Sequence, residues 1–113
     1  LKDKAAFQTG KARLNRAIFG TLKKVAKNLA KMEGRIQVIG HTDDIPISND
    51  EFSSNWELSS IRATAVLHKL MEYEPDLADR IQAEGHADVD PIEDNQNSMG
   101  RSANRRVEII LKK

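Results

Sequence analysis

Two segments that start 45 residues apart carry the same short pattern, and this repeat limits the folds open to the chain. Residues 36–46 and residues 81–91 both read Ile-Gln-x-x-Gly-His-x-Asp-x-x-Pro, which gives six identities at a fixed offset. Two copies are too few for a solenoid. We therefore expect two similar strand-to-loop units whose strands end at the same edge of one sheet, where open α/β sheets bind ligands.

A first helix is predicted upstream of the repeat. Apolar residues follow helical spacing from Leu14 to Leu29, and lysine and arginine side chains fill the opposite face. Such a basic stripe is typical of a solvated helix face, and we favour this interpretation over a polyanion site. Gly34 is expected to end the helix at its C′ position. The apolar run 36–39 then predicts a strand.

A second helix is predicted between the two copies of the repeat. Ser54 and Glu57 have the spacing of a capping box, with Ser54 as the N-cap. The buried stripe runs from Leu58 to Leu70, and the helix should stop before Pro75. Because this helix joins the two repeat strands, it indicates a crossover between parallel strands.

The rest of the chain predicts two more strands and a polar loop. The strands cover residues 80–84 and 107–111, and the loop covers 88–100, with a short helical turn near Ser102. A further strand before Leu1 would complete the sheet. The fold class is therefore α/β, a two-layer βαβαβ sandwich with a small mixed sheet whose first strand is truncated.

Length and composition restrict the function classes. The 113 residues suit a single domain, residues 1–113. With 18 basic and 17 acidic residues the net charge is +1, which gives no case for a nucleic-acid partner. No apolar run reaches the ~20 residues of a membrane span, so the chain itself is not expected to insert into a membrane. It begins at Leu1 rather than Met, so we interpret it as a fragment with any anchor upstream.

Arg62 is the most informative charged residue. It lies four residues after Leu58 and four before Val66, on or beside the apolar stripe of the second predicted helix. A charge there must be paired or must reach a site. One interpretation is an internal salt bridge, and the other is a guanidinium that binds a carboxylate in two-point contact.

Asp43 is the second candidate, in the loop after the first repeat strand. It could simply hold the loop through an Asx turn. If the site binds a zwitterion, however, Asp43 would hold the ammonium group and Arg62 the carboxylate. Each charge-assisted hydrogen bond would contribute roughly 1.5–3 kcal/mol.

A metal site is the competing interpretation of the repeat. The repeat places two His-x-Asp triplets at neighbouring strand ends, His41 with Asp43 and His86 with Asp88. On an extended segment, side chains that are two residues apart point in the same direction, so the four could hold one metal ion. The pattern is common by chance, so we favour histidines that pack against their loops, with no metal and no other cofactor.

Other chemistry has little support in the sequence. The chain has no cysteine, no Gly-x-Ser-x-Gly and no phosphate-binding glycine loop, so no catalytic residue is assigned and we do not expect an enzyme. Arg105 and Arg106 precede the last strand. Because strand side chains alternate, only one of the two should face the site.

Three segments together resemble the signature of the OmpA-like domain family. They are Gly-His-Thr-Asp at 40–43, Leu-Ser-x-x-Arg-Ala at 58–63 and Gly-Arg-x-x-Asn-Arg-Arg-Val at 100–107. The Asp-Asp-Ile-Pro run at 43–46 and Ser-Asn-Trp-Glu-Leu-Ser at 54–59 look more specifically like the B subunits of the flagellar motor stator, of the MotB and PomB type. The resemblance spans nearly the whole chain.

The resemblance implies non-covalent binding of peptidoglycan through the diaminopimelate of its stem peptide. Asp43 would hold the ammonium group of this ligand and Arg62 its carboxylate. The other implied site residues would complete or shape the site: Asn55, Leu58 and Arg105, with Thr42 and Asn104. The second repeat departs from the family pattern at residues 85–88, Gly-His-Ala-Asp, which leaves the role of His86 and Asp88 open.

The resemblance also implies a cellular setting. The chain would be the periplasmic domain of an inner-membrane protein, would form a homodimer, and would meet the stator A subunit through a membrane part outside this sequence. Two alternatives stay open: a wall anchor of a non-flagellar envelope complex, and a metal-dependent hydrolase that uses the two His-x-Asp triplets.

Overall fold

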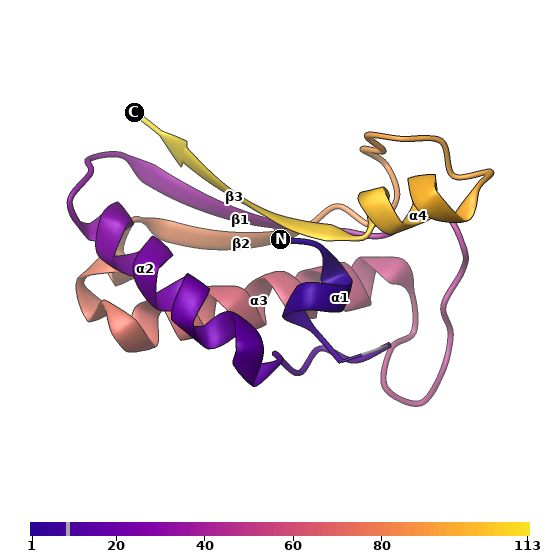
Figure 1. Cartoon of the computed structure of the whole chain (residues 1–113), viewed down its shortest axis with the longest axis horizontal. Helices are drawn as coiled ribbons and strands as arrows, with labels where there is room; N and C mark the ends of the chain where they lie inside the picture. The colour runs from indigo at the N-terminus through magenta and orange to yellow at the C-terminus, as the bar shows by residue number, and fades with distance from the viewer. Residues whose placement is uncertain (9) are drawn as a thin grey trace.

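Figure 1 shows the computed structural model of the chain, which describes residues 1–8 and 10–113. The elements follow in the order α1 (Asp3–Ala6), η1 (Arg16–Ile18), α2 (Phe19–Ala30), β1 (Arg35–His41), α3 (Asn55–Tyr73), η2 (Pro75–Arg80), β2 (Ile81–Gly85), α4 (Ser98–Asn104) and β3 (Arg106–Lys112). The η elements are single stretches of 3₁₀ helix.

The two copies of the repeat are neighbouring strands in register. The sheet order is β2-β1-β3, with β1 parallel to β2 and antiparallel to β3. Ile36 pairs with Ile81 and Gly40 with Gly85, so equivalent positions of the two copies lie side by side. This confirms the predicted common edge and makes the sheet mixed.

The helices cover one face of the sheet. In Figure 1, α1, α2 and α3 lie below the three strands, and α4 lies beyond one end of the sheet. Leu22 of α2 and Val66 and Leu70 of α3 are fully buried against Ile36 and Val38 of β1. Burial of alternate strand residues under an amphipathic helix layer gives the α/β two-layer fold that the sequence predicts.

The repeated glycine lets α3 approach the sheet closely. A Cβ atom at Gly40 would lie far inside contact distance of the Ser59 carbonyl oxygen, and one at Gly85 would overlap Ser60. The first half of α3 therefore passes directly over the ends of β1 and β2. This contact fixes the position of the α3 residues that face the loop after β1.

α3 begins and ends where the sequence predicts. The hydroxyl of Ser54 accepts a hydrogen bond from the Glu57 backbone N–H at 3.3 Å, as the N-cap of a capping box does. The helix ends at Tyr73, two residues before Pro75. The predicted short helical turn near Ser102 is α4.

The first predicted helix is shorter at both ends. α2 begins only at Phe19, because the preceding segment runs beside the N-terminus, where Leu14 bridges Phe7 and the Asn15 N–H donates to the Ala6 carbonyl. Gly34 is not its C′ residue, since the helix ends at Ala30. Gly34 instead has a φ of 125° in the turn into β1, where a side chain would meet the Lys112 carbonyl.

The N-terminal residues pair with the edge of β3. Lys2 forms an antiparallel bridge with Arg106, and Leu1 and Val107 exchange two backbone hydrogen bonds of 2.9 and 2.8 Å. The strand expected before Leu1 would extend this pairing, and it stays a prediction. The short helix α1, which the sequence did not predict, follows at once. None of the helices described here is long and apolar enough to cross a membrane.

Candidate ligand-binding site

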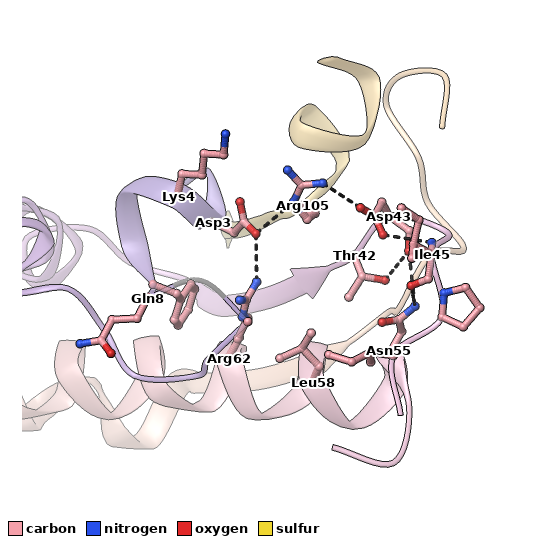
Figure 2. Close-up of a pocket in the computed structure, with 14 residues that line it drawn as sticks. Asp3, Lys4, Gln8, Thr42, Asp43, Ile45, Asn55, Leu58, Arg62 and Arg105 are labelled. Carbon is pink, nitrogen blue, oxygen red and sulfur yellow. Dashed lines mark hydrogen bonds and ion pairs between the residues drawn. The ribbon is translucent and has the colours of Figure 1, made fainter. Parts of the chain in front are cut away.

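A pocket of about 340 Å³ opens between α1, the loop after β1 and the first half of α3. Figure 2 shows charged side chains from all of these elements converging on it. The described residues that line it are Asp3, Lys4, Phe7, Gln8, Gly10, Thr42, Asp43, Ile45, Pro46, Ile47, Asn55, Leu58, Arg62 and Arg105. Six of the seven residues implied by the sequence are in this set, and the seventh, Asn104, is not.

Arg62 is both internally paired and part of the pocket wall. Its Nε donates to the Lys11 carbonyl at 2.9 Å, and Nη1 donates to Asp3 Oδ2 at 3.3 Å. Its guanidinium carbon lies 4.8 Å from the centre of the Phe7 ring, and the residue is only 5% exposed. Arg62 therefore forms the internal salt bridge that was one of its two predicted roles, and it also lines the pocket, while the binding of a ligand carboxylate stays a prediction.

Asp43 forms the predicted Asx turn and also lines the pocket. Oδ1 accepts the Ile45 backbone N–H at 3.0 Å, which is the Asx turn. Oδ2 accepts from Arg105 Nη1 at 2.8 Å and faces the pocket. One oxygen thus holds the loop while the other is presented in the pocket.

Asp3 links the two arginines, and the sequence analysis missed it. Its Oδ2 accepts from Arg62 Nη1 and from Arg105 Nε at 3.1 Å, while Oδ1 is buried without a partner in the described part of the chain. The charges therefore alternate in a row, Arg62, Asp3, Arg105 and Asp43. Asp3 lies in a helix of only four residues, too short for any periodic signal to mark it.

Burial and ion pairing shift the pKa values of the two guanidinium groups in opposite directions. Burial lowers the pKa of Arg62, and the nearby Asp3 only partly offsets it. Burial also lowers the pKa of Arg105, but its hydrogen bond to Asp43 and its attraction to Asp3 raise it by more. Both groups remain cationic, because an arginine side chain is effectively always protonated in a protein.

The remaining predicted residues shape the pocket. Asn55, the first residue of α3, donates from Nδ2 to the Ile45 carbonyl at 3.0 Å. The Thr42 hydroxyl donates to the Asp43 carbonyl at 2.8 Å, and Thr42 N–H donates to Ala87. Leu58 is buried and gives the wall an apolar part. The loop after β1 is therefore tied both to α3 and to the second repeat.

Asn104 acts at a distance from the pocket. It is fully buried, and its Oδ1 accepts the backbone N–H groups of Ile92 and Glu93 at 2.8 and 2.9 Å. It therefore holds the loop before α4 rather than contacting the pocket. Arg106 points away from the pocket, toward Glu108 and the carbonyl of Asp90, so only Arg105 of the arginine pair faces it, as strand alternation predicted.

The structure does not bring together the four residues of the metal site that the repeat suggested, so that interpretation is wrong. β1 ends at His41 and the chain then turns, so Asp43 faces Arg105 while His41 faces His86. Asp88 is exposed and is not among the described residues grouped near the two histidines. The prediction from the two-residue spacing failed because it requires the backbone to stay extended beyond the end of the strand.

The pocket can bind a small group that carries both charges. Two carboxylates and two guanidinium groups face one cavity whose walls also include apolar side chains such as Phe7, Leu58 and Pro46. The guanidinium groups suit a carboxylate, because a planar donor fork matches its two oxygens. The Asp43 carboxylate suits an ammonium group.

Comparison with known proteins identifies relatives over most of the chain. A family model described as the OmpA family matches residues 6–105. Motility protein B of Bacillus subtilis is 37% identical over 112 residues, which are 98% of this chain and 43% of that protein. The chain thus spans less than half the length of this curated relative.

Two solved structures of related proteins have the same fold as this chain. The structure of the cell wall anchor of the T6SS from Pseudomonas aeruginosa has a TM-score of 0.89 and 36% identity, and the match covers 96% of this chain and 76% of that one. The periplasmic domain of Helicobacter pylori MotB (residues 78–256) has a TM-score of 0.85 and 28% identity, with coverage of 96% and 71%.

Proposed function

The chain belongs to the OmpA family, and from this premise we propose that its pocket binds peptidoglycan without cleaving it. The observation that carries the proposal is the convergence of Arg62, Arg105 and Asp43 in one pocket. A wall-binding module needs positioned charges and no nucleophile or general base. The binding would be non-covalent and reversible, and it would require no cofactor.

The ligand group that best suits these charges is the diaminopimelate of the stem peptide. The free end of its side chain carries an ammonium and a carboxylate group on one carbon atom. Arg62 would hold the carboxylate and Asp43 the ammonium group, with Arg105 between them. Asn55, Leu58 and Thr42 would complete the wall, while Asn104 would act through the loop that it supports.

The proposed biological role is to anchor a larger membrane complex to the cell wall from the periplasm. The relation to motility protein B supports a flagellar motor stator, and a matched structure described as a cell wall anchor of the T6SS supports the same module in another complex. A homodimer and an association with a stator A subunit would depend on parts of the protein beyond this chain.

The first test is binding to purified sacculi that contain diaminopimelate. We expect Asp43→Asn and Arg62→Ala each to lower the bound fraction at least tenfold, because losing one charge-assisted hydrogen bond costs roughly 1.5–3 kcal/mol. The matched controls are Asp44→Asn and Arg35→Ala, two exposed residues that do not line the pocket. Circular dichroism would verify that each variant is folded. Normal binding by both pocket variants would refute the site.

A second comparison tests the ligand rather than the site. Sacculi with lysine in place of diaminopimelate keep the glycan and the ammonium group but lack the second carboxylate. We expect unmodified protein to bind them at least tenfold more weakly, and Arg62→Ala to show little further loss. Equal binding to both kinds of sacculi would exclude recognition of diaminopimelate, even if wall binding itself were retained.

Which membrane complex the chain anchors has to be tested in cells. Replacing the matching region of Bacillus subtilis motility protein B with this chain would be followed by measuring swimming. Restored swimming that is lost with Arg62→Ala supports the stator role. A chimera that binds sacculi but does not swim favours a non-flagellar wall anchor.

A further inference from the structure

A second cluster of polar side chains lies apart from the pocket, on the helix-free side of the sheet. His41, His86 and Asp90 each offer one ligand atom, and these atoms all lie within 4.8 Å of one another. The two imidazole rings meet edge to face, with centroids 5.4 Å apart and an angle of 85° between their planes. None of the three residues lines the peptidoglycan pocket.

Strand pairing explains why these side chains meet. Gly40 pairs with Gly85, so the residues that follow, His41 and His86, are neighbours across β1 and β2. His41 projects from the face opposite Gly40, which contacts α3. The turn after β2 places Asp90 beside the two rings. This turn is held by Arg106, whose Nη2 donates to the Asp90 backbone carbonyl at 3.0 Å.

His41 is buried and has no hydrogen-bond partner among the residues that the structure describes. It is 5% exposed, and neither of its ring nitrogens makes a hydrogen bond to the part of the chain that the structure describes. Glu108 Oε1 lies 3.2 Å from its Nε2 but outside hydrogen-bond geometry. Buried polar atoms are rarely left unpaired in native proteins, so these two nitrogens point to a missing partner.

The surroundings favour a cation as that partner. Glu84, Asp90 and Glu108 surround the imidazoles, and Arg106 is paired with Glu108 at 2.7 Å, so it offsets only one of these three carboxylates. Burial lowers the pKa of His41, and the nearby Arg106 lowers it further.

His86 already has the arrangement that metal-bound histidines show. Its Nδ1 lies 2.8 Å from Asp90 Oδ2, while its Nε2 lies 3.1 Å from Glu84 Oε2. A histidine that binds a metal through one nitrogen usually donates the other N–H to a carboxylate, which fixes the ring orientation. Glu84 would take that orienting role and leave Nδ1 for the ion.

We propose that His41, His86 and Asp90 bind a divalent transition-metal ion, with zinc as the representative ion. Two imidazoles and one carboxylate suit zinc, nickel or copper better than magnesium or calcium, which prefer oxygen ligands. A tetrahedral zinc ion holds its ligand atoms about 3.3–3.6 Å apart, given bonds of about 2.0–2.2 Å. The side chains of His86 and Asp90 sit on an accessible turn, so small rotations bring the group to that spacing.

The test is titration of the chelator-treated 113-residue chain with zinc chloride, followed by calorimetry and by thermal unfolding. We expect one zinc ion per chain and an unfolding midpoint that rises with zinc concentration, because an ion that binds only the folded state stabilises it. His86→Gln and Asp90→Asn should each lower the affinity at least tenfold. Magnesium chloride at the same concentration should have no effect.

Matched controls separate this site from non-specific binding. His68→Gln removes an exposed histidine on α3, and Asp88→Asn removes an exposed carboxylate from the same turn as Asp90. Both should bind zinc like the unmodified chain. Absence of stoichiometric zinc binding overturns the proposal. So does binding that survives His86→Gln, or binding that His68→Gln or Asp88→Asn abolishes. Sacculus binding is measured separately, so either proposal can fail alone.

Discussion

Asp3 determines the charge balance of the pocket. Its Oδ2 is shared between Arg62 and Arg105, at 3.3 and 3.1 Å. Without this carboxylate, two guanidinium groups would lie close together with only Asp43 to compensate them. Buried charges are tolerated when they are paired, so Asp3 allows the site to hold two arginines before any ligand arrives.

Asp3→Asn should therefore destabilise the chain. We expect the free energy of unfolding to fall by about 1.5–3 kcal/mol, because a hydrogen-bonded charge is lost between two partly buried cations. Urea unfolding of the variant and of the unmodified chain measures the difference. Asp76→Asn, an exposed residue in η2, is the control and should change stability little. Equal stability of Asp3→Asn and the unmodified chain would contradict the bridging role.

At the scale of elements, the contact between α3 and the strand ends places the site. Ser59 and Ser60 of α3 lie directly against the repeated glycines Gly40 and Gly85. The same contact is reinforced by the hydroxyl of Ser59, which accepts the Ala87 backbone N–H at 3.1 Å. The serines lie between the pocket residues Leu58 and Arg62 on the same helix, so a displaced α3 would displace the pocket wall.

Two glycine substitutions should have opposite effects on stability. Gly40→Ala should lower the free energy of unfolding by about 1–3 kcal/mol, because the new methyl group overlaps the Ser59 backbone. Gly20→Ala should raise it by about 0.5–1 kcal/mol, since Gly20 lies in α2 with nothing within 4 Å of the added atom. Urea unfolding measures both. A stable Gly40→Ala variant would show that α3 can move away without cost.

At the scale of the molecule, one apolar cluster connects segments from both ends of the chain. It includes Ala6 and Phe7 near the N-terminus, Leu22 and Val66 of the helix layer, and Val107 of β3. The pocket lies where α1 meets α3 and the loop after β1, and the histidine cluster lies on the other side of the sheet. Both sites therefore depend on the same core.

We expect the 113-residue chain to unfold in one cooperative transition, as a single domain of this size does. Trp56, the single tryptophan, reports on the start of α3 beside the pocket, and far-ultraviolet circular dichroism reports on all helices. The two signals should give the same urea midpoint. Separate midpoints would mean that the pocket region unfolds independently of the α2, α3 and sheet core.

The sequence by itself predicted the order of the main helices and strands after α1 and singled out Arg62 and Asp43 as candidate site residues. The repeat predicted neighbouring strands because identical local patterns favour identical local structure, and Arg62 stood out because a charge on an apolar stripe must be paired. The capping box and Pro75 likewise marked the limits of α3. These signals are local, so they could be read before any fold was known.

Only the tertiary structure decided which distant groups meet. Asp3 reaches Arg62 across 59 positions and Arg105 across 102. Such contacts leave no periodic trace in the sequence. The chain turn after His41 separated Asp43 from the histidines, and the turn after β2 placed Asp90 beside them instead. Short-range spacing predicts the direction of a side chain only while the backbone stays regular, and both sites are built where regular backbone ends.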